Sequence, residues 1–184
     1  FNDWGDPMPG YCEIDMVAHG GTSVAGSFIQ TLTMTDIATG WTECMPMVAR
    51  EGSLVVEAMT RAQSLFPGLI RGADFDNDSA FMNDVVVPWC RSQTIEVTRS
   101  RAYKKNDQAT VESKNNHLVR KYGFYYRYDT DAERVELNRL WKLVNDRFNY
   151  LTPTKKPLGF GTDAAGRRKR LYDKPATPLD RLLS

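Results

Sequence analysis

The sequence is poor in the residues that build disulfide frameworks and zinc sites. Its 184 residues include only three cysteines and two histidines. Cys12, Cys44 and Cys90 are odd in number, far apart and in no CxxC arrangement, so we expect buried free thiols in a reducing cytosol. His19 and His117 have too few partners to complete a His/Cys zinc module. The composition therefore argues against a disulfide-stabilised protein and against a zinc-binding module.

Long apolar runs are missing as well. No stretch approaches the ~20 residues that a membrane-spanning helix requires, and the N-terminus has no signal-peptide pattern. We therefore expect no membrane contact. Residues 1–10 hold two prolines, two glycines and two aromatics, which is typical of a lead-in. The chain starts neither on methionine nor on a domain-like boundary, and we expect a fragment of a longer protein with a region missing upstream.

The net charge of +1 conceals a strong asymmetry along the chain. Residues 1–98 carry 13 acidic and 4 basic side chains, a net charge of −9. Residues 99–150 carry 12 basic and 7 acidic side chains, and residues 151–184 carry 8 and 3, so each segment has a net charge of +5. This division suggests a metal site on one side and a polyanion path on the other. A charge gradient that merely aids solubility would explain the same numbers.

A chain of this length can bury one sizeable core. We expect a lead-in over residues 1–10, one main domain over 11–150 and a basic C-terminal extension over 151–184. The extension contains four prolines and the run Arg167–Arg170. It could be a solvated tail or an ordered DNA-binding arm.

The first half of the chain alternates strand and helix patterns. Residues 11–19, 26–36 and 40–47 are strand-like and separated by short turns, which favours an antiparallel meander. A helix over 53–65, capped by Ser53, follows. Strands over 69–74 and 94–97 flank a second helix over 80–92, which Pro88 should end or kink. This order predicts an α/β layered fold with a mixed sheet.

Two further helices follow. One begins at Asn106 or Asp107, contains Glu112 and stops at Gly123, a favourable C-terminal glycine. The other opens with a capping box at 130–133. Its apolar stripe predicts packing on the sheet or on a neighbouring subunit; the stripe consists of Val135, Leu137, Leu140, Trp141, Val144 and Phe148.

Three carboxylates stand at notable places in this scheme. Asp15 lies inside the first strand and points away from the face of Ile14, Asp76 directly follows a strand, and Glu112 lies on a helix. A charge in a central strand is unfavourable without a partner or ligand, and Mg²⁺ prefers carboxylate oxygens. Two ions about 3.5–4 Å apart could assist an in-line phosphoryl displacement. With 23 acids in the chain, solvated or capping carboxylates remain the alternative.

The local sequence around these residues is informative. The segment 76–81, DNDSAF, resembles the D-N-G-x-x-F element of the integrase-core, or DDE, recombinases, which include bacterial insertion-sequence transposases and retroviral integrases. Thirty-five residues lie between Asp76 and Glu112, which is the D-D-35-E spacing of that family. The segment TRSRAYKKNDQATVESKN resembles the stretch around the family's glutamate. Gly40-Trp41 and the ending YDKPATPLDRLL extend the resemblance over nearly the whole chain.

The resemblance implies an RNase H-like fold, with a three-stranded antiparallel meander plus two parallel strands, flanked by helices. It implies a bacterial, nucleoid-associated transposase catalytic core that cleaves transposon ends and joins their 3′-hydroxyls to target DNA. Two Mg²⁺ or Mn²⁺ ions would serve both steps, with Asp15 bridging them and Asp76 and Glu112 each holding one. The expected partners are double-stranded DNA and further copies of the chain, as a dimer or higher oligomer.

Some positions depart from the family pattern. Asp78 stands where the family usually has glycine; aspartate tolerates a left-handed backbone better than most residues, so the turn can survive. Asp74 and Asp78 remain alternatives to Asp76, although alignment on Asn77 and the following phenylalanine favours Asp76. Many DDE transposases carry Lys or Arg seven residues after the glutamate, and this chain has Val119 there.

We expect DNA contacts around Glu112, because cations bind the phosphate backbone without reading sequence. Gln108 lies one turn before Glu112, where retroviral integrases have an active-site glutamine. An ordinary solvated basic loop is the alternative. The expected contact residues are Arg99, Arg101, Tyr103, Lys104, Lys105, Gln108, Lys114 and Asn115.

Two other functions fit the same fold. One is a nuclease of the ribonuclease H type, which would cut RNA–DNA hybrids without joining strands. The other is a transposase remnant that holds DNA without cutting it. The 35-residue spacing speaks against the first, and the three intact carboxylates speak against the second.

Overall fold

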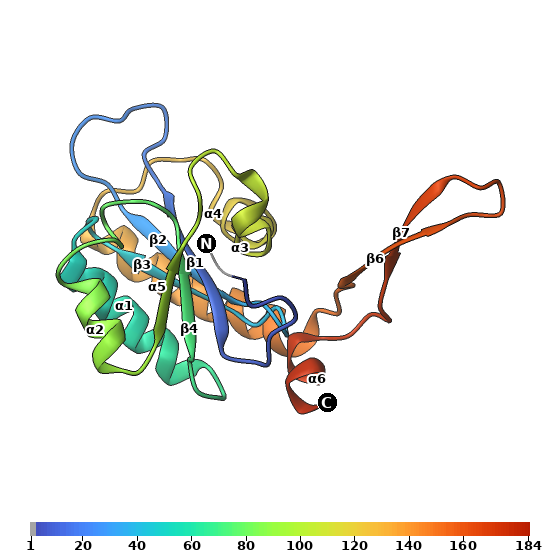
Figure 1. Ribbon diagram of the computed structural model, residues 1–184. Helices are drawn as coiled ribbons and strands as arrows, with labels where there is room; N and C mark the ends of the chain where they lie inside the picture. The colour runs from blue at the N-terminus through green and yellow to red at the C-terminus, as the bar shows by residue number, and fades with distance from the viewer. Residues whose placement is uncertain (1–2) are drawn as a thin grey trace.

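The computed structural model describes residues 3–184, except for the side chains at positions 105 and 106. A five-stranded sheet in the order β3-β2-β1-β4-β5 forms its centre (Figure 1). The β1–β2 and β2–β3 pairs are antiparallel, whereas β1–β4 and β4–β5 are parallel. The predicted mixed sheet is therefore confirmed. Its strands are β1 (Tyr11–Ala18), β2 (Gln30–Asp36), β3 (Thr42–Met47), β4 (Gly72–Phe75) and β5 (Glu96–Arg99).

Helical segments cover both faces of the sheet. They are α1 (Gly52–Leu65), α2 (Val86–Ser92), η1 (Lys105–Gln108), α3 (Ala109–Lys114), η2 (Asn115–Arg120), α4 (Lys121–Gly123), α5 (Asp131–Asp146), η3 (Arg147–Leu151) and α6 (Pro178–Leu183). η1 is a 3₁₀ turn, and η2 and η3 are π-turns. None of the helices in the described part of the chain is both long and apolar enough to span a bilayer.

Alternation along β1 directs its side chains into two cores. Ile14 lies in the core beneath α1 and α2, whereas Val17 lies in a second core with residues of η2 and α5. Asp15 projects on the Val17 side and is half-buried. The expectation that Asp15 points away from the Ile14 face is therefore confirmed, and it places Asp15 under the helix that carries Glu112.

Three details of the helix ends differ from the sequence-based expectations. The N-cap of α1 is Glu51, without a side-chain capping bond, rather than Ser53. The α2 helix begins at Val86, so Pro88 lies in its first turn, where an N–H has no intrahelical partner and proline is tolerated. Pro88 therefore neither ends nor kinks this helix.

The helix that contains Glu112 ends near Gly123, but Gly123 is not its left-handed residue. Phe124 takes that conformation, with a φ of 58°. A Cβ on Gly123 would lie 3.0 Å from the Trp141 ring. Close packing against α5, rather than backbone freedom, therefore requires glycine at this position.

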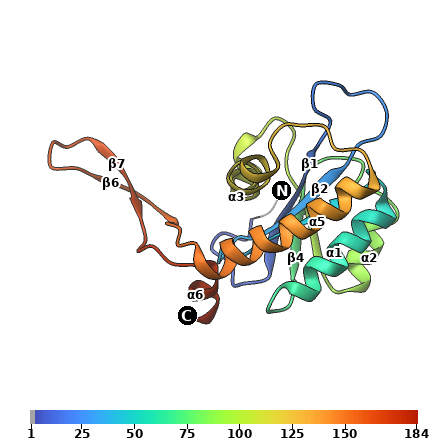
Figure 2. The ribbon, with the colours of Figure 1, turned by 180° about the vertical axis from the view of Figure 1, so that it is seen from behind.

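The long α5 helix begins at the predicted capping box of Thr130 and Glu133 and runs beside α1 (Figure 2). Together with η3, which follows it directly, α5 also closes the outer edge of β3. The Asn149 side chain accepts a hydrogen bond from the Thr42 N–H and donates to the Thr42 carbonyl, both at 2.9 Å. One turn earlier, Asn145 makes the same pair of bonds to Cys44, at 3.2 and 3.3 Å. The two asparagines thus satisfy the β3 backbone as a sixth strand would.

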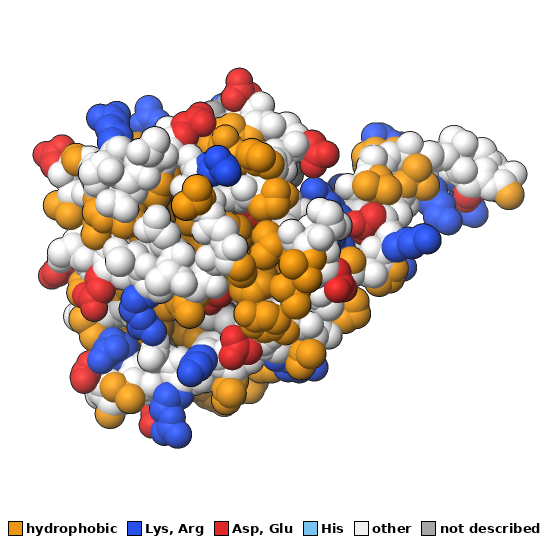
Figure 3. All heavy atoms as spheres, turned by 90° about the horizontal axis from the view of Figure 1, so that it is seen from below, with side chains coloured by type: hydrophobic (Ala, Val, Ile, Leu, Met, Phe, Trp, Pro, Cys, Tyr) orange, Lys and Arg blue, Asp and Glu red, His pale blue; other side chains and the backbone are white. Residues whose placement is uncertain are grey.

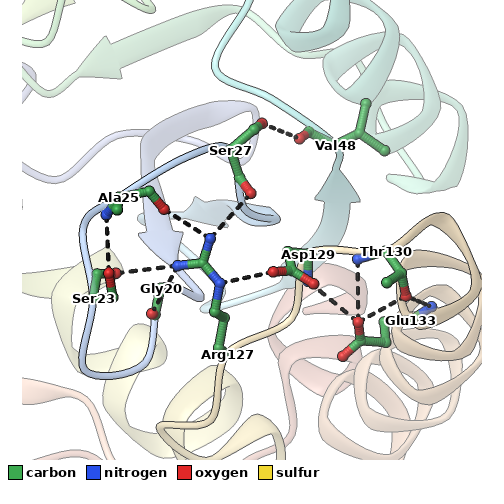
Figure 4. A network of polar contacts seen from close by, with 9 residues as sticks. All are labelled: Gly20, Ser23, Ala25, Ser27, Val48, Arg127, Asp129, Thr130 and Glu133. Carbon is green, nitrogen blue, oxygen red and sulfur yellow. Dashed lines mark hydrogen bonds and ion pairs between the residues drawn. The ribbon is translucent and has the colours of Figure 1, made fainter.

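A single guanidinium holds the loop between β1 and β2 (Figure 4). Arg127 donates to the carbonyls of Gly20, Ser23, Ala25 and Ser27 at 2.8–3.4 Å. Its Nε also donates to Asp129 at 2.7 Å, next to the α5 cap. The Arg127 side chain therefore adds to the backbone bonds between the ends of this loop and the segment before α5, in which Tyr128 pairs with His19 and Ile29.

After η3 the chain leaves the body as a hairpin of β6 (Pro157–Thr162) and β7 (Arg168–Tyr172), which projects away from the main sheet (Figure 1). The sequence had not predicted these strands. α6 returns to the body, where Leu179 and Leu182 pack on the first core. Arg181 of α6 fixes the base of the hairpin by donating to Thr154 and pairing with Asp173.

All three cysteines are free and buried, as the sequence predicted. Burial raises the pKa of the Cys12, Cys44 and Cys90 thiols, and the charges of Asp36 and Glu43 raise those of the first two further. Because the thiolate is the reactive form, these thiols are chemically inert.

Candidate active site

Two of the predicted carboxylates lie next to each other across the parallel pair of β1 and β4. Ile14 is in register with Phe75, so the next residues on the two strands, Asp15 and Asp76, are neighbours. The Asp76 N–H continues the ladder by donating to the Ile14 carbonyl at 3.4 Å. Both side chains are half-buried. The register of the sheet alone therefore brings these two carboxylates together.

The helix that carries Glu112 is attached to the same strands by two contacts. The Val111 N–H donates to the Glu13 carboxylate at 2.8 Å. The Gln108 amide donates to the carbonyls of Ile14 at 3.3 Å and Asp74 at 2.9 Å. These bonds hold the start of α3 over the site, and they leave Glu112 exposed at its rim.

The charges of Asp76 and Glu112 act on Asp15. The pKa of Asp15 is raised to about 6, first by burial and then by the charges of Asp76 and Glu112, against the opposing effect of bonds from the Met16 N–H and the Asn115 amide. Those two donors lie 2.8 and 3.0 Å from Asp15 oxygens. Mutual repulsion of this kind is relieved by a cation, so the chemistry of the donor set fits a divalent ion.

No three Asp, Glu, His or Cys side chains converge closely enough to hold one ion together, within the residues that the structure describes. The carboxylates instead suit a metal ion in pairs, because Asp15 lies next to Asp76 and the charge of Glu112 acts on Asp15. Each carboxylate oxygen has two lone pairs, so the bonds from Met16 and Asn115 leave Asp15 capacity for ligation.

A second acidic pair lies one step deeper and was missed by the sequence analysis. Glu13 and Asp74 are in register across β1 and β4, and both are buried. Burial raises the pKa of Glu13 to about 7; the Val111 N–H opposes this shift, and the charge of Asp74 adds to it. The Thr98 hydroxyl donates to Asp74 at 2.6 Å. The alternation that singled out Asp15 also places Glu13 on the same side of β1, and this was the available signal.

Asp74, Asp76 and Asp78, which the sequence left as alternatives for the site, have different environments in the structure. Asp74 is fully buried, and Asp78 is turned away into an ion pair with Arg50. Asp78 also accepts a bond from the Ala80 N–H at 2.8 Å, and it is not among the described residues with positive φ. The expected left-handed backbone at Asp78 is therefore not used. Asp76 is the aspartate whose charge acts on Asp15.

The expected DNA contacts divide into an outer and an inner group. In the outer group, Arg99, Arg101, Tyr103 and Lys104 are exposed, and Arg101 makes a two-pronged pair with Asp107 at 2.9 and 3.0 Å. The Lys105 side chain lies outside the described part of the structure. In the inner group, Gln108 and Asn115 turn their amides toward the strands. Lys114 is half-buried, with its Nζ 4.9 Å from the centre of the Phe148 ring.

The π-turn η2 accounts for the cation missing seven residues after Glu112. Val119, at that position, is fully buried in the second core. A π-turn contains one more residue than an α-turn. The helix position that the seventh residue after Glu112 would occupy in a regular α-helix is therefore occupied by the eighth residue, Arg120. Its guanidinium donates to the Ala18 carbonyl at 3.2 Å.

Comparisons with known proteins concern the family and the fold of the chain. A sequence-family model described as the integrase core domain matches residues 7–105, a span that includes Asp15 and Asp76 and ends before Glu112. A protein of Sinorhizobium fredii (strain NBRC 101917 / NGR234), named "Uncharacterized protein y4rM", is 52% identical over 181 residues, with 98% of this chain and 51% of the relative covered. The chain therefore spans about half the length of this curated relative.

Among solved structures, the crystal structure of the catalytic core domain of BIV integrase superposes with a TM-score of 0.61 at 12% identity, and covers 95% of this chain and 93% of that chain. At this identity the likeness concerns the fold alone, and it identifies the mixed sheet and its helices as RNase H-like. With more than half of the chain matched by the family model, the chain belongs to the integrase core domain family, within the polynucleotidyl transferase superfamily.

Proposed function

We propose that this chain is the catalytic core of a DDE transposase, which cleaves the ends of a mobile DNA element and joins them to target DNA. The observation that carries the proposal is the placement of Asp15 beside Asp76 at the ends of two parallel strands, with Glu112 at the rim of the helix above, where its charge acts on Asp15. Family membership supports the class of reaction. The joining of two element ends also makes a dimer or higher oligomer part of the proposal.

In this proposal Asp15, Asp76 and Glu112 would hold two Mg²⁺ or Mn²⁺ ions, with Asp15 as the carboxylate that both ions would share. Bound there, the ions would supply charge neutralisation and activation of the attacking oxygen. Asn115 and the Met16 N–H orient Asp15, and Gln108 fixes α3 on the strands. The protein's own part in the reaction is therefore mainly the positioning of its carboxylates and of the DNA.

The test combines activity with metal binding. Asp15→Asn, Asp76→Asn and Glu112→Gln should each abolish strand transfer on element-end DNA, and each should weaken Mn²⁺ binding measured by calorimetry. Asp84→Asn is the matched control, because Asp84 is exposed and lies outside the site. Full strand transfer by any of the three variants would refute the assignment. Cleavage of an RNA–DNA hybrid with no strand joining would instead identify a ribonuclease H-type nuclease.

A further inference from the structure

A basic groove separates α3 from the base of the projecting hairpin. It has a volume of about 440 Å³ and is lined by the β2–β3 turn, one side of α3 and the chain on either side of the hairpin. Ser113, the residue after Glu112, lies on its wall. No acidic side chain of the described residues lines it, whereas five cations do: Lys114, Lys155, Lys156, Arg170 and Arg181.

The charges of this groove are only partly compensated. Lys156 and Arg181 pair with Asp6 and Asp173. Lys155 and Arg170 are exposed and make no salt bridge to any described residue. Cations that line one groove without acidic partners repel one another, and a bound polyanion stabilises them.

The same charge continues outward along one face of the hairpin. Phe160 and Arg170 are in register, as are Thr162 and Arg168, so these side chains share a face. The Arg168 guanidinium lies 3.8 Å from the centre of the Phe160 ring, and that of Arg170 lies 5.5 Å from it. Such stacking orients a guanidinium while its charge stays available. Figure 3 shows Lys and Arg side chains along the arm and at its junction with the body.

The hairpin is also held in its projecting position. Thr154 and Ala176 form a bridge at its base, the Lys156 N–H donates to Asp173, and Arg181 donates to Thr154. An isolated two-stranded hairpin is only marginally stable in water, and this one has almost no contact with the body beyond that base. A fixed, exposed arm that carries Arg168 and Arg170 on one face requires little reordering when it binds an extended partner.

We propose that the groove and the Phe160 face of the hairpin form one track for the phosphate backbone of duplex DNA, which leads from the side of α3 beside Glu112 out along the arm. This inference rests on the proposed function, because it assigns a path to the DNA on which that function acts. The track binds by charge and without reading sequence.

The test compares two triple variants for binding of a duplex of arbitrary sequence across a salt series, in EDTA so that metal binding does not contribute. Lys155→Ala/Arg168→Ala/Arg170→Ala removes three cations of the track. Arg91→Ala/Arg139→Ala/Lys142→Ala removes the same charge from exposed positions on α2 and α5. We expect the track variant to lose roughly tenfold or more in affinity and to flatten the slope of log K against log salt by about 2–3. The control should stay within about twofold of the parent chain.

Each outcome either supports or overturns the proposed DNA track. Wild-type affinity and salt slope in the track variant would overturn the inference, and so would a loss of self-association, seen by sedimentation, without a loss of DNA binding. Partial rescue by Arg168→Lys/Arg170→Lys, with an unchanged melting temperature, would show that charge rather than folding is responsible. Because binding is measured without metal, the comparison of the two triple variants does not depend on the carboxylate site. Strand transfer by Asp15→Asn would refute the proposed function and leave the binding result intact.

Discussion

Asp15 is oriented by a donor from its own strand and by another from the helix above it. The Met16 N–H lies next to it in sequence, whereas Asn115 reaches it from one turn beyond Glu112. Asn115 is buried, so its amide is committed to this contact. It acts as a positioning residue, and the pKa of Asp15 depends partly on its bond.

Asn115→Ala should therefore weaken Mn²⁺ binding and strand transfer by about 10–100-fold, the range typical for loss of a partner that orients a metal ligand. Asn116→Ala is the control, because Asn116 is the adjacent exposed residue. Titration with Mn²⁺ gives a readout that does not depend on DNA. Equal affinities in the two variants would remove Asn115 from the site.

Glu43 is a buried acid outside the candidate site, on the edge strand β3. Burial raises its pKa from 4.5 to about 7, against bonds from the Trp41 indole and the Asn145 amide. Between these values the folded protein keeps a proton that the unfolded chain has released. The contribution of Glu43 to stability therefore falls as the pH rises from 4.5 to 7.

Glu43→Gln should flatten this dependence. A shift of this size corresponds to about 3 kcal/mol across the window, so the parent chain should lose up to that much more stability than the variant between pH 4.5 and pH 7.5. Urea unfolding of both proteins at the two pH values measures the difference. Parallel losses in the two proteins would show that Glu43 does not titrate in this range.

At the scale of elements, α5 and η3 pair backbone groups of β3 that an edge strand normally leaves without a partner in the sheet. An open edge invites pairing with another chain. Asn145 and Asn149 are one helical turn apart and meet Cys44 and Thr42, which are two residues apart on β3. The helix thus protects the edge while packing its apolar stripe on the second core.

Asn145→Ala/Asn149→Ala should destabilise the fold by about 2–6 kcal/mol, since each truncation leaves buried backbone groups unpaired. The variant should also form aggregates on mild heating, which light scattering detects. Asn138→Ala on the same helix is the control; its side chain only accepts a bond from Arg61 at the surface and should change stability by about 0.5 kcal/mol or less. Similar effects in both variants would contradict the edge-closing role.

The strands could be predicted because their signals are local. Alternation and short turns placed β1, β2 and β3, whereas the register of β1 with β4 was not predicted and comes from the structure. The broken helix around Glu112 could not be predicted, because its start depends on Glu13 and Gln108, whose contacts are about a hundred residues away in sequence. Asn145 of α5 and Asn149 of η3 gave no signal either, since polar residues on a helix ordinarily face solvent. Asp15 was predicted from its position in a strand, and Asp76 and Glu112 from the motif and their spacing.

At the scale of the molecule, the body and the arm differ in how they are stabilised. The body has two apolar cores, whereas the residues of β6 and β7 are almost all exposed. Replacement of residues 158–171 by a short Gly-Ser turn should therefore leave the melting temperature of the body within about 2 °C of the parent chain. Differential scanning calorimetry measures this, and a larger drop would mean that the arm supports the core.

Because the native cysteines are buried, the arm can be labelled selectively with a dye. Since Cys12, Cys44 and Cys90 are inert while the fold is intact, a thiol introduced at the exposed tip, as in Ala164→Cys, would be the only site that reacts rapidly with a maleimide dye. The protein thus offers a background-free labelling position without removal of its native cysteines. Energy transfer from that dye to a labelled duplex would follow the approach of DNA to the arm in real time.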